Sequence, residues 1–303
     1  MVFRYQHAGT STFVPEVWAS ELLTQFDPLL VWASRLVSNR DYEGEIQVRG
    51  NVVHVNSLAR PAVGEYTIAE GMTAQRPETV DQEIPISEAD YIQLLIEKTE
   101  RVQVAASNLG SPINRQMVRA LAAKADTFMG NVIAASATTL PNIAPVAGSI
   151  PASLYGVILD MMLALDDNDV PEDRRYVVVS PRVKRYLVEH PAIANAGAYG
   201  EGGVTAHGVV ARLAGFTVAS TTAMPSGVDI VAGHPDFATF ASQFNDFREG
   251  MSERYYATHV DTIHLYGGKV LRYPGMDTKK ADSTWDESLP TKGILKATVK
   301  WPA

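Results

Sequence analysis

The first forty residues carry two short apolar stripes. Trp18, Leu22 and Phe26 recur at every fourth position and predict a helix over 15–26. The Asp27-Pro28 pair then restarts a helical pattern, with apolar residues from 29 to 36. Stripes this narrow on short helices need another surface to lie on.

From residue 41 the period changes to two. Ile46 and Val48, a Gly50-Asn51 turn, and Val53 and Val55 predict a hairpin. Residues 56–85 then combine prolines, glycines and many charges with scattered apolar positions, and weak alternation resumes over 86–96. A segment with strand-like ends and no core of its own is uncommon inside a compact domain. Residues 56–85 are therefore either a lid or a segment that lies on another subunit.

A long helix follows, with Ser111 as its N-cap and Pro112 in its first turn. Its length suits the spine of a fold. The apolar positions expected on its buried face are Ile113, Met117, Leu121, Ala125, Phe128 and Val132.

The second half alternates helices and strands. Residues 138–152 are a proline-rich boundary, Ser153 opens a helix, 176–179 form a buried strand, and Ser180-Pro181 cap another helix. Further segments are a glycine-rich loop at 197–208, a strand at 228–232, returning alternation over 237–273, and one last possible strand in ILKATVKW. This succession predicts an α+β fold.

Composition excludes several classes. The chain has 303 residues, 46% of them hydrophobic, a net charge of −8 and no cysteine. It is a folded protein without thiol chemistry or thiolate metal sites. The first residues lack the apolar run expected of a secretory signal. No membrane span is expected, because Pro141, Pro145 and Pro151 interrupt the uncharged run at 127–159. No cluster of Lys and Arg is evident, so contact with nucleic acid should be weak and unspecific.

Candidate chemistry is sparse. The glycine loop does not match the dinucleotide or phosphate motifs, and no nucleophile elbow or zinc-protease motif occurs. The acidic run at 166–173 lacks the glycine and the final glutamate of a calcium loop, so a solvated turn is expected. His259 and His264 are five apart in a strand-like region and should face opposite sides. We predict no catalytic residue, no metal ligand and no cofactor.

The charges around the long segment allow two interpretations. Arg49, Arg60 and Arg76 alternate with acidic residues, and such charges are either a solvated surface or an intersubunit network. The residues predicted to contact another subunit are Trp18, Arg49, Arg60, Glu65, Tyr66, Glu70, Arg76 and Glu78.

The order of these segments resembles the major capsid proteins of tailed bacteriophages, which have the Hong Kong 97 type fold. The resemblance is carried over about residues 13–275 by FVPEVWASELL, GNVVHV, VVVSPRVKRYL, RLAGFTV and HLYGGKVLRYPG. It implies an N-terminal arm at 1–40, a β-hairpin and extended intersubunit loop at 41–98, and a spine helix at 99–137. It further implies an axial domain at 138–235, peripheral-domain strands at 236–277 and a C-terminal extension at 278–303.

In this family pattern the axial loop candidates Tyr199, Glu201 and His207 lie near a fivefold or sixfold centre. The implied function is a major capsid protein that self-assembles through hexamers and pentamers into an icosahedral head around double-stranded DNA. The implied partners are scaffolding and portal proteins and non-specifically contacted DNA, with no membrane. The implied location is the virion capsid, assembled in the bacterial cytoplasm. The tail from Asp277 to Ala303 has no counterpart in this family pattern, and our hypothesis is that it is an extra strand that leans on a neighbouring subunit.

Two other functions stay open. An encapsulin-type compartment shell shares this fold and encloses a cargo enzyme. A soluble α+β enzyme with residues 56–85 as its lid is the alternative from a different class.

Overall fold

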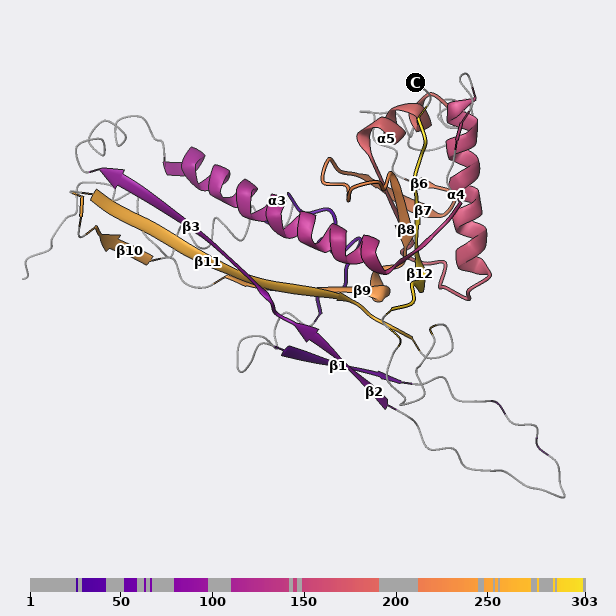
Figure 1. Ribbon diagram of the computed structural model, residues 1–303, viewed down its shortest axis with the longest axis horizontal. Helices are drawn as coiled ribbons and strands as arrows, with labels where there is room; N and C mark the ends of the chain where they lie inside the picture. The colour runs from indigo at the N-terminus through magenta and orange to yellow at the C-terminus, as the bar shows by residue number, and fades with distance from the viewer. Residues whose placement is uncertain are drawn as a thin grey trace, which may run out of the picture. The chain divides into compact units, whose positions relative to one another are not determined.

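The fold is described from a computed structural model, shown in Figure 1. It describes residues 26, 29–41, 52–58, 63, 66, 79–97, 110–141, 144–145, 149–190, 212–244, 248–252, 254–255, 257–273, 277, 286 and 288–301. The chain divides into two compact units. Unit 1 comprises Met1–Leu30, Ser87–Ala125 and Ser242–Tyr266, and unit 2 comprises Val31–Ile86, Asp126–Ala241 and Gly267–Ala303.

Unit 2 contains a six-stranded sheet in the order β4-β12-β8-β5-β7-β6. Its strands are β4 (Ala137–Thr139), β5 (Tyr176–Val179), β6 (Arg212–Leu213), β7 (Phe216–Ser220), β8 (Ile230–Gly233) and β12 (Thr291–Ala297). All residues of the central strands β5 and β8 are buried, as their apolar sequences YVVV and IVAG require. In Figure 1, helices α4 (Ile150–Asp166) and α5 (Pro181–Val188) lie beside this sheet.

Local capping signals set the starts of both helices. The Ser180 hydroxyl accepts a hydrogen bond from the Val183 amide at 3.4 Å, so the predicted cap of α5 is confirmed. The predicted start of α4 at Ser153 is wrong. The helix begins at Ile150, because Ser149 takes the N-cap position and Pro151 fits the first turn.

The last strand, β12, is an internal strand of the sheet and lies between β4 and β8. β12 pairs in parallel with β4 and antiparallel with β8. Ile294 and Leu295 are at most 2% exposed. The predicted strand is confirmed, but the expectation that this tail leans on a neighbouring subunit is wrong for the described residues 288–301, since the chain's own sheet takes up its apolar side chains.

A two-stranded ribbon is formed by β1 (Val52–Leu58) and β2 (Thr79–Pro85), whose register runs from Val52–Pro85 to Leu58–Thr79. Figure 1 shows the two strands side by side. The predicted strand at Val53 and Val55 is therefore present, but it pairs with 79–85. Residues 42–51, which include the predicted Gly50-Asn51 turn, lie outside the described residues.

A second sheet has the order β10-β11-β3, and β9 also pairs with β11. Its strands are β3 (Glu88–Glu97), β9 (Ala238–Phe244), β10 (Arg248–Met251) and β11 (Ala257–Val270). The alternation predicted over 86–96 is confirmed, because Asp90 is buried while Tyr91 and Leu95 are exposed. His264 is buried and His259 is partly exposed, so the two histidines face opposite sides as predicted.

The spine helix α3 (Gly110–Ser136) is confirmed, but the predicted N-cap at Ser111 is wrong, because the helix begins at Gly110 and Ser111 lies inside it. Its buried face differs from the predicted one at the C-terminal end. Met129 and Ile133 are fully buried, whereas Phe128 and Val132 are partly exposed. The buried residues keep a spacing of four from Met117 to Ile133, whereas the prediction changed to a spacing of three at Phe128. None of the described helices is long and apolar enough to cross a membrane.

Candidate assembly site

Most residues predicted to contact other subunits lie outside the described part of the chain. These are Trp18, Arg49, Arg60, Glu65, Glu70, Arg76, Glu78, Tyr199, Glu201 and His207. Tyr66 is described, and its side chain is 60% exposed. Val63 nearby is 100% exposed. The base of this extended segment is the ribbon formed by β1 and β2.

The base of the ribbon has a small core. Val55 and Ile84, one from each strand, pack with Leu271, and all three are at most 3% exposed. Gln82 beside them is buried, and its side chain exchanges two hydrogen bonds with the main chain of Arg272. The Gln82 Nε2 donates to the carbonyl at 2.7 Å, and the Arg272 amide donates to Oε1 at 2.9 Å. The glutamine thus pairs as a neighbouring strand would, and it fixes the ribbon to the chain after β11.

An ion pair extends this contact to the C-terminal region. The guanidinium of Arg272 lies 3.6 Å from Asp277, and their side chains are 4% and 3% exposed. Arg272 Nη2 also donates to the Leu289 carbonyl at 2.7 Å, and Asp277 accepts from the Tyr273 amide at 3.0 Å. Buried charges need such additional hydrogen bonds to offset their lost hydration. The base of the ribbon and the approach to β12 are therefore one connected structure.

A close backbone approach completes the base. A Cβ added to Gly267 would lie 2.1 Å from the Pro85 carbonyl oxygen at the end of β2. Only glycine permits this passage of β11 beside the ribbon.

The described end of the N-terminal region is held by one aspartate. Asp126 of α3 accepts hydrogen bonds from the amides of Val31, Trp32 and Ala33 at 2.8, 2.6 and 3.1 Å. Burial raises the pKa of Asp126, and these three hydrogen bonds oppose the rise. The contact was not predicted, and its sequence signal is a lone acidic residue beside the apolar residues of the predicted buried face.

Trp32 strengthens this contact between residues 31–33 and α3. Its side chain is fully buried, and its indole N–H donates to the Ala223 carbonyl at 2.8 Å. The ring lies against Gly130, where an added Cβ would be 3.0 Å from Nε1. A few residues later, Asn39 bridges to Thr239 of β9. The region preceding the ribbon is thus fixed at two points of unit 2.

Unit 1 has its own buried polar contact. Asp90 of β3 accepts from Tyr266 at 2.7 Å and pairs with Lys124 of α3. Burial raises the pKa of Asp90, but these hydrogen bonds outweigh burial and the net pKa is lowered. Tyr266 stacks on His264, which stacks on Phe244 at 4.2 Å. This cluster joins the second sheet to the spine helix.

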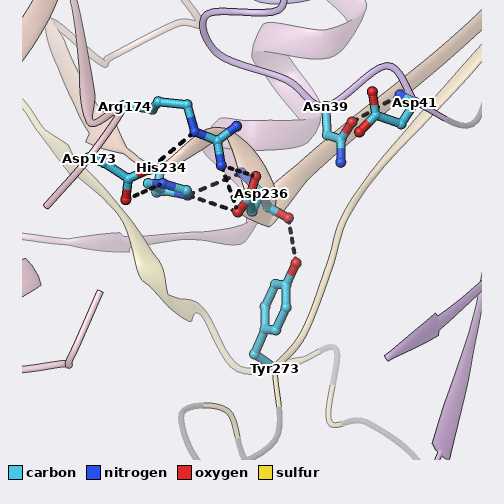
Figure 2. A network of polar contacts seen from close by, with 7 residues as sticks. All are labelled: Asn39, Asp41, Asp173, Arg174, His234, Asp236 and Tyr273. Atoms are coloured by element: carbon cyan, nitrogen blue, oxygen red, sulfur yellow. Dashed lines mark hydrogen bonds and ion pairs between the residues drawn. The ribbon is translucent and has the colours of Figure 1, made fainter. Parts of the chain in front are cut away.

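A further polar network surrounds His234, at the end of β8 (Figure 2). The histidine is 1% exposed, and its Nδ1 accepts from the Asp236 amide at 3.3 Å. Nε2 faces Asp173 at 3.9 Å. Arg174 donates to both carboxylate oxygens of Asp236 at 3.2 Å, and Figure 2 shows Tyr273 reaching the Asp236 carbonyl from the other side, at 2.9 Å.

This network makes stability depend on pH. Burial lowers the pKa of His234 below its usual 6.5, although Asp236 and Asp173 oppose this. The unfolded chain then binds a proton at a higher pH than the folded chain, so this histidine weakens the fold as the pH falls below about 6.5. We expect His234→Asn, whose amide oxygen can still cap the Asp236 amide, to reduce the pH slope of stability between pH 5 and 7 by up to about 1.4 kcal/mol per pH unit. Denaturation at several pH values measures this, and an unchanged slope would contradict it.

These polar contacts stabilise the fold. Each charged group above is engaged by hydrogen bonds or ion pairs from elsewhere in the chain. The acidic run at 166–173 ends α4 and forms the turn into β5, where Asp169 and Arg174 have φ values of 56° and 53°. Arg175 pairs with Asp166 at 2.6 Å across this turn. Among the described residues no group of three His, Asp or Glu side chains could hold a metal ion.

The chain matches a known protein family. A family described as phage capsid protein matches residues 104–273, more than half of the chain. The chain belongs to the phage capsid protein family. The match includes the spine helix, the six-stranded sheet up to β8 and the returning strand β11. None of the curated protein sequences matches.

Solved capsid structures have the same fold as this capsid protein. A structure from Mycobacterium phage Che8 is 23% identical, with a TM-score of 0.65, covering 88% of this chain and 90% of that one. The capsid structure of Cyanophage P-SCSP1u is 14% identical, with a TM-score of 0.61, covering 84% and 85%. A virus-like particle from Pyrococcus furiosus is 10% identical, with a TM-score of 0.55, covering 93% and 98%.

These comparisons confirm the function expected from the sequence. The protein is the major capsid protein that forms the icosahedral head of a phage, and its place is the virion capsid. The α+β fold is confirmed as that of phage capsid structures. The family is one of structural proteins, so the enzyme alternative is not supported. The compartment alternative is not favoured, because the matching family is that of phage capsids.

Proposed function

We propose that the subunits assemble as hexamers and pentamers, and that the part of residues 56–90 beyond the base of the β1–β2 ribbon lies over the neighbouring subunit. The observation that carries this proposal is the uneven support of the β1–β2 ribbon. Its base packs through Val55, Ile84 and Leu271, while Val63 and Tyr66 are exposed. A two-stranded ribbon is only marginally stable alone, so contact with a second copy would supply the missing partner.

We assign the remaining segments by the same family pattern. Residues 1–40 are the arm, 41–98 the hairpin and extended loop, 99–137 with 236–277 the peripheral domain, and 138–235 the axial domain. The pairing of β12 with β4 and β8 supports one change, which is that the described end of the chain belongs with the axial domain. The loop with Tyr199, Glu201 and His207 then lies at the fivefold and sixfold centres.

The further partners of this subunit are proposals as well. A shell of this kind needs a scaffolding protein and a portal, and it holds double-stranded DNA by non-specific contact, without a membrane. Assembly takes place in the bacterial cytoplasm. The net charge of −8 suits a wall that does not hold DNA tightly.

The charge network of the extended loop can be tested directly. We expect Arg60→Glu and Arg76→Glu each to reduce shell yield while the subunit stays folded, because a reversed charge repels its partner across the interface. Arg60→Lys and Arg76→Lys keep the charge and should retain most of the yield. Light scattering and circular dichroism measure the two properties. Full yield from both glutamate variants would remove the charge network from the proposal.

A further inference from the structure

The C-terminal half of α4 is apolar on two sides. Its inner side packs on β12 and α5. On its outer side lie Leu159 and Leu163, one helical turn apart. Leu159 is partly exposed, and Leu163 is 58% exposed. A helix that is apolar on both sides is typical of one covered on both, so this α4 leucine pair has room for a partner.

Two carboxylates border the α4 leucine pair. Asp160 and Asp167 are exposed, and they stand three positions before and four positions after Leu163, on the same side of the helix. Neither forms an ion pair with a cation among the described residues. The sequence has no Lys or Arg from 125 to 173 that could neutralise them. A partner that fits this surface is therefore apolar and carries a positive charge, and a phosphate backbone is repelled.

These charges also decide how two copies of the chain can meet here. Two α4 helices that face each other across a twofold axis would bring Asp160 and Asp167 close to their own copies, and like charges in an interface cost free energy. A contact between two different surfaces avoids this cost, and when it is repeated around an axis it closes a ring. The matching surface is therefore a different, cationic part of the next copy.

The six-stranded sheet offers such a surface at its far edge. Helix α4 packs on β12, the neighbour of edge strand β4, whereas β6 forms the opposite edge. Arg212 of β6 is exposed, and no carboxylate in the described part of the chain pairs with it. Leu213 of β6 and Val218 of β7 are partly exposed. Successive strand residues alternate, so Arg212 and Leu213 border this edge from its two faces and a partner that meets the edge contacts both.

The edge is also short of strand partners. β6 pairs with β7 only through Arg212–Thr217 and Leu213–Phe216. On the side away from β5, no described strand pairs with Val218. Unpaired edges of native sheets are commonly covered by a helix or a loop. A helix from a neighbouring copy is thus a suitable cover for this edge.

We propose that the C-terminal half of α4 packs on the β6–β7 edge of the next copy in the same ring. The α4 leucine pair covers the partly exposed side chains of that edge, and Asp160 and Asp167 attract the partner copy's positive charge. The contact joins opposite ends of the sheet in consecutive copies, as a head-to-tail ring requires. The inference rests on the proposed assembly as hexamers and pentamers and gives those rings a specific contact.

The absence of cysteine from the chain makes crosslinking a direct test. The double variant Leu163→Cys, Leu213→Cys, assembled at full length with a scaffolding protein where one is required, is treated with a short bismaleimide. We expect a ladder of covalent oligomers that ends in pentamers and hexamers. Each single-cysteine variant is the control and should stay monomeric on a denaturing gel, because the contact joins two different surfaces.

A substitution series measures what the contact contributes. Leu163→Glu places a third carboxylate beside Asp160 and Asp167 and should reduce shell yield at least about tenfold. Its thermal unfolding should match that of the parent protein, because Leu163 is exposed in the subunit. Leu163→Met keeps an apolar side chain of similar volume and should retain most of the yield. Arg212→Glu should lose yield as well, while Arg212→Lys keeps it.

Three results would overturn the inference. Crosslinking of the single variant Leu163→Cys to itself would place α4 on a twofold axis. Intact shells that give no ladder from the double variant, with the thiol at 163 still open to maleimide, would show that α4 is uncovered. Crosslinking of that thiol to the scaffolding protein would assign the surface to a different partner. Failure of the parent protein to form any shell would contradict the proposed function itself and this contact with it.

Discussion

Gly267→Ala should destabilise the subunit by about 3 kcal/mol or more and abolish shell assembly, because no side chain can move aside to admit the new methyl group. The added Cβ would be 2.1 Å from the Pro85 carbonyl oxygen and 2.9 Å from the Ile86 Cα, and both are backbone atoms. The end of β2 must then shift, and with it the ribbon that carries the extended loop. Thermal unfolding and the yield of particles by light scattering measure the two effects.

Alanine substitutions at two other glycines provide controls with smaller expected effects on stability. At Gly268 the closest atom to an added Cβ is the Met129 sulfur at 2.6 Å, the end of a flexible side chain. Gly268→Ala should therefore cost less than Gly267→Ala. At Gly156, inside α4, an added Cβ meets nothing within 4 Å, so alanine should be neutral or stabilising by up to about 1 kcal/mol. If Gly267→Ala assembled as well as Gly156→Ala, the ribbon base would not control assembly.

Ending the chain at Pro290 should leave a subunit that does not fold, because it removes β12 from between β4 and β8. The deletion takes away Ile294, Leu295 and Val299, which are at most 4% exposed. At about 1.5–3 kcal/mol for each buried side chain, these three contribute about 5–9 kcal/mol. The total stability of a domain is about 5–15 kcal/mol. Soluble expression and circular dichroism measure the outcome.

A shorter deletion is the control for this truncation. Removing Lys300–Ala303 leaves β12 and Val299 in place, so the subunit should fold and assemble. Assembly by the chain that ends at Pro290 would show that the sheet does not need its last strand.

Elements with strong local signals were predicted from the sequence. The spine helix has a first-turn proline and a long run of apolar residues at helical spacing, and the buried strand Tyr176–Val179 is wholly apolar. The cap at Ser180 was predicted because its hydrogen bond joins residues three apart. The start of α4 was missed by three residues, since two serines near Pro151 offered similar caps.

Contacts between distant residues could not be predicted in this way. Gln82 and Arg272 are 190 positions apart, and neither has a sequence context that names the other. The place of β12 in the sheet is also decided by tertiary pairing, since an alternating terminal strand fits its own sheet or a neighbour's equally well.

The central claim is that this subunit builds a closed shell by placing its extended loop on a neighbour. Electron cryomicroscopy of particles assembled from the full-length protein, with a scaffolding protein where one is required, tests it most directly. We expect a closed icosahedral shell of hexamers and pentamers in which the residues between β1 and β2 contact the adjacent subunit and the β1–β2 base keeps its packing on Leu271. Particles in which the residues between β1 and β2 fold back onto their own subunit would contradict the account.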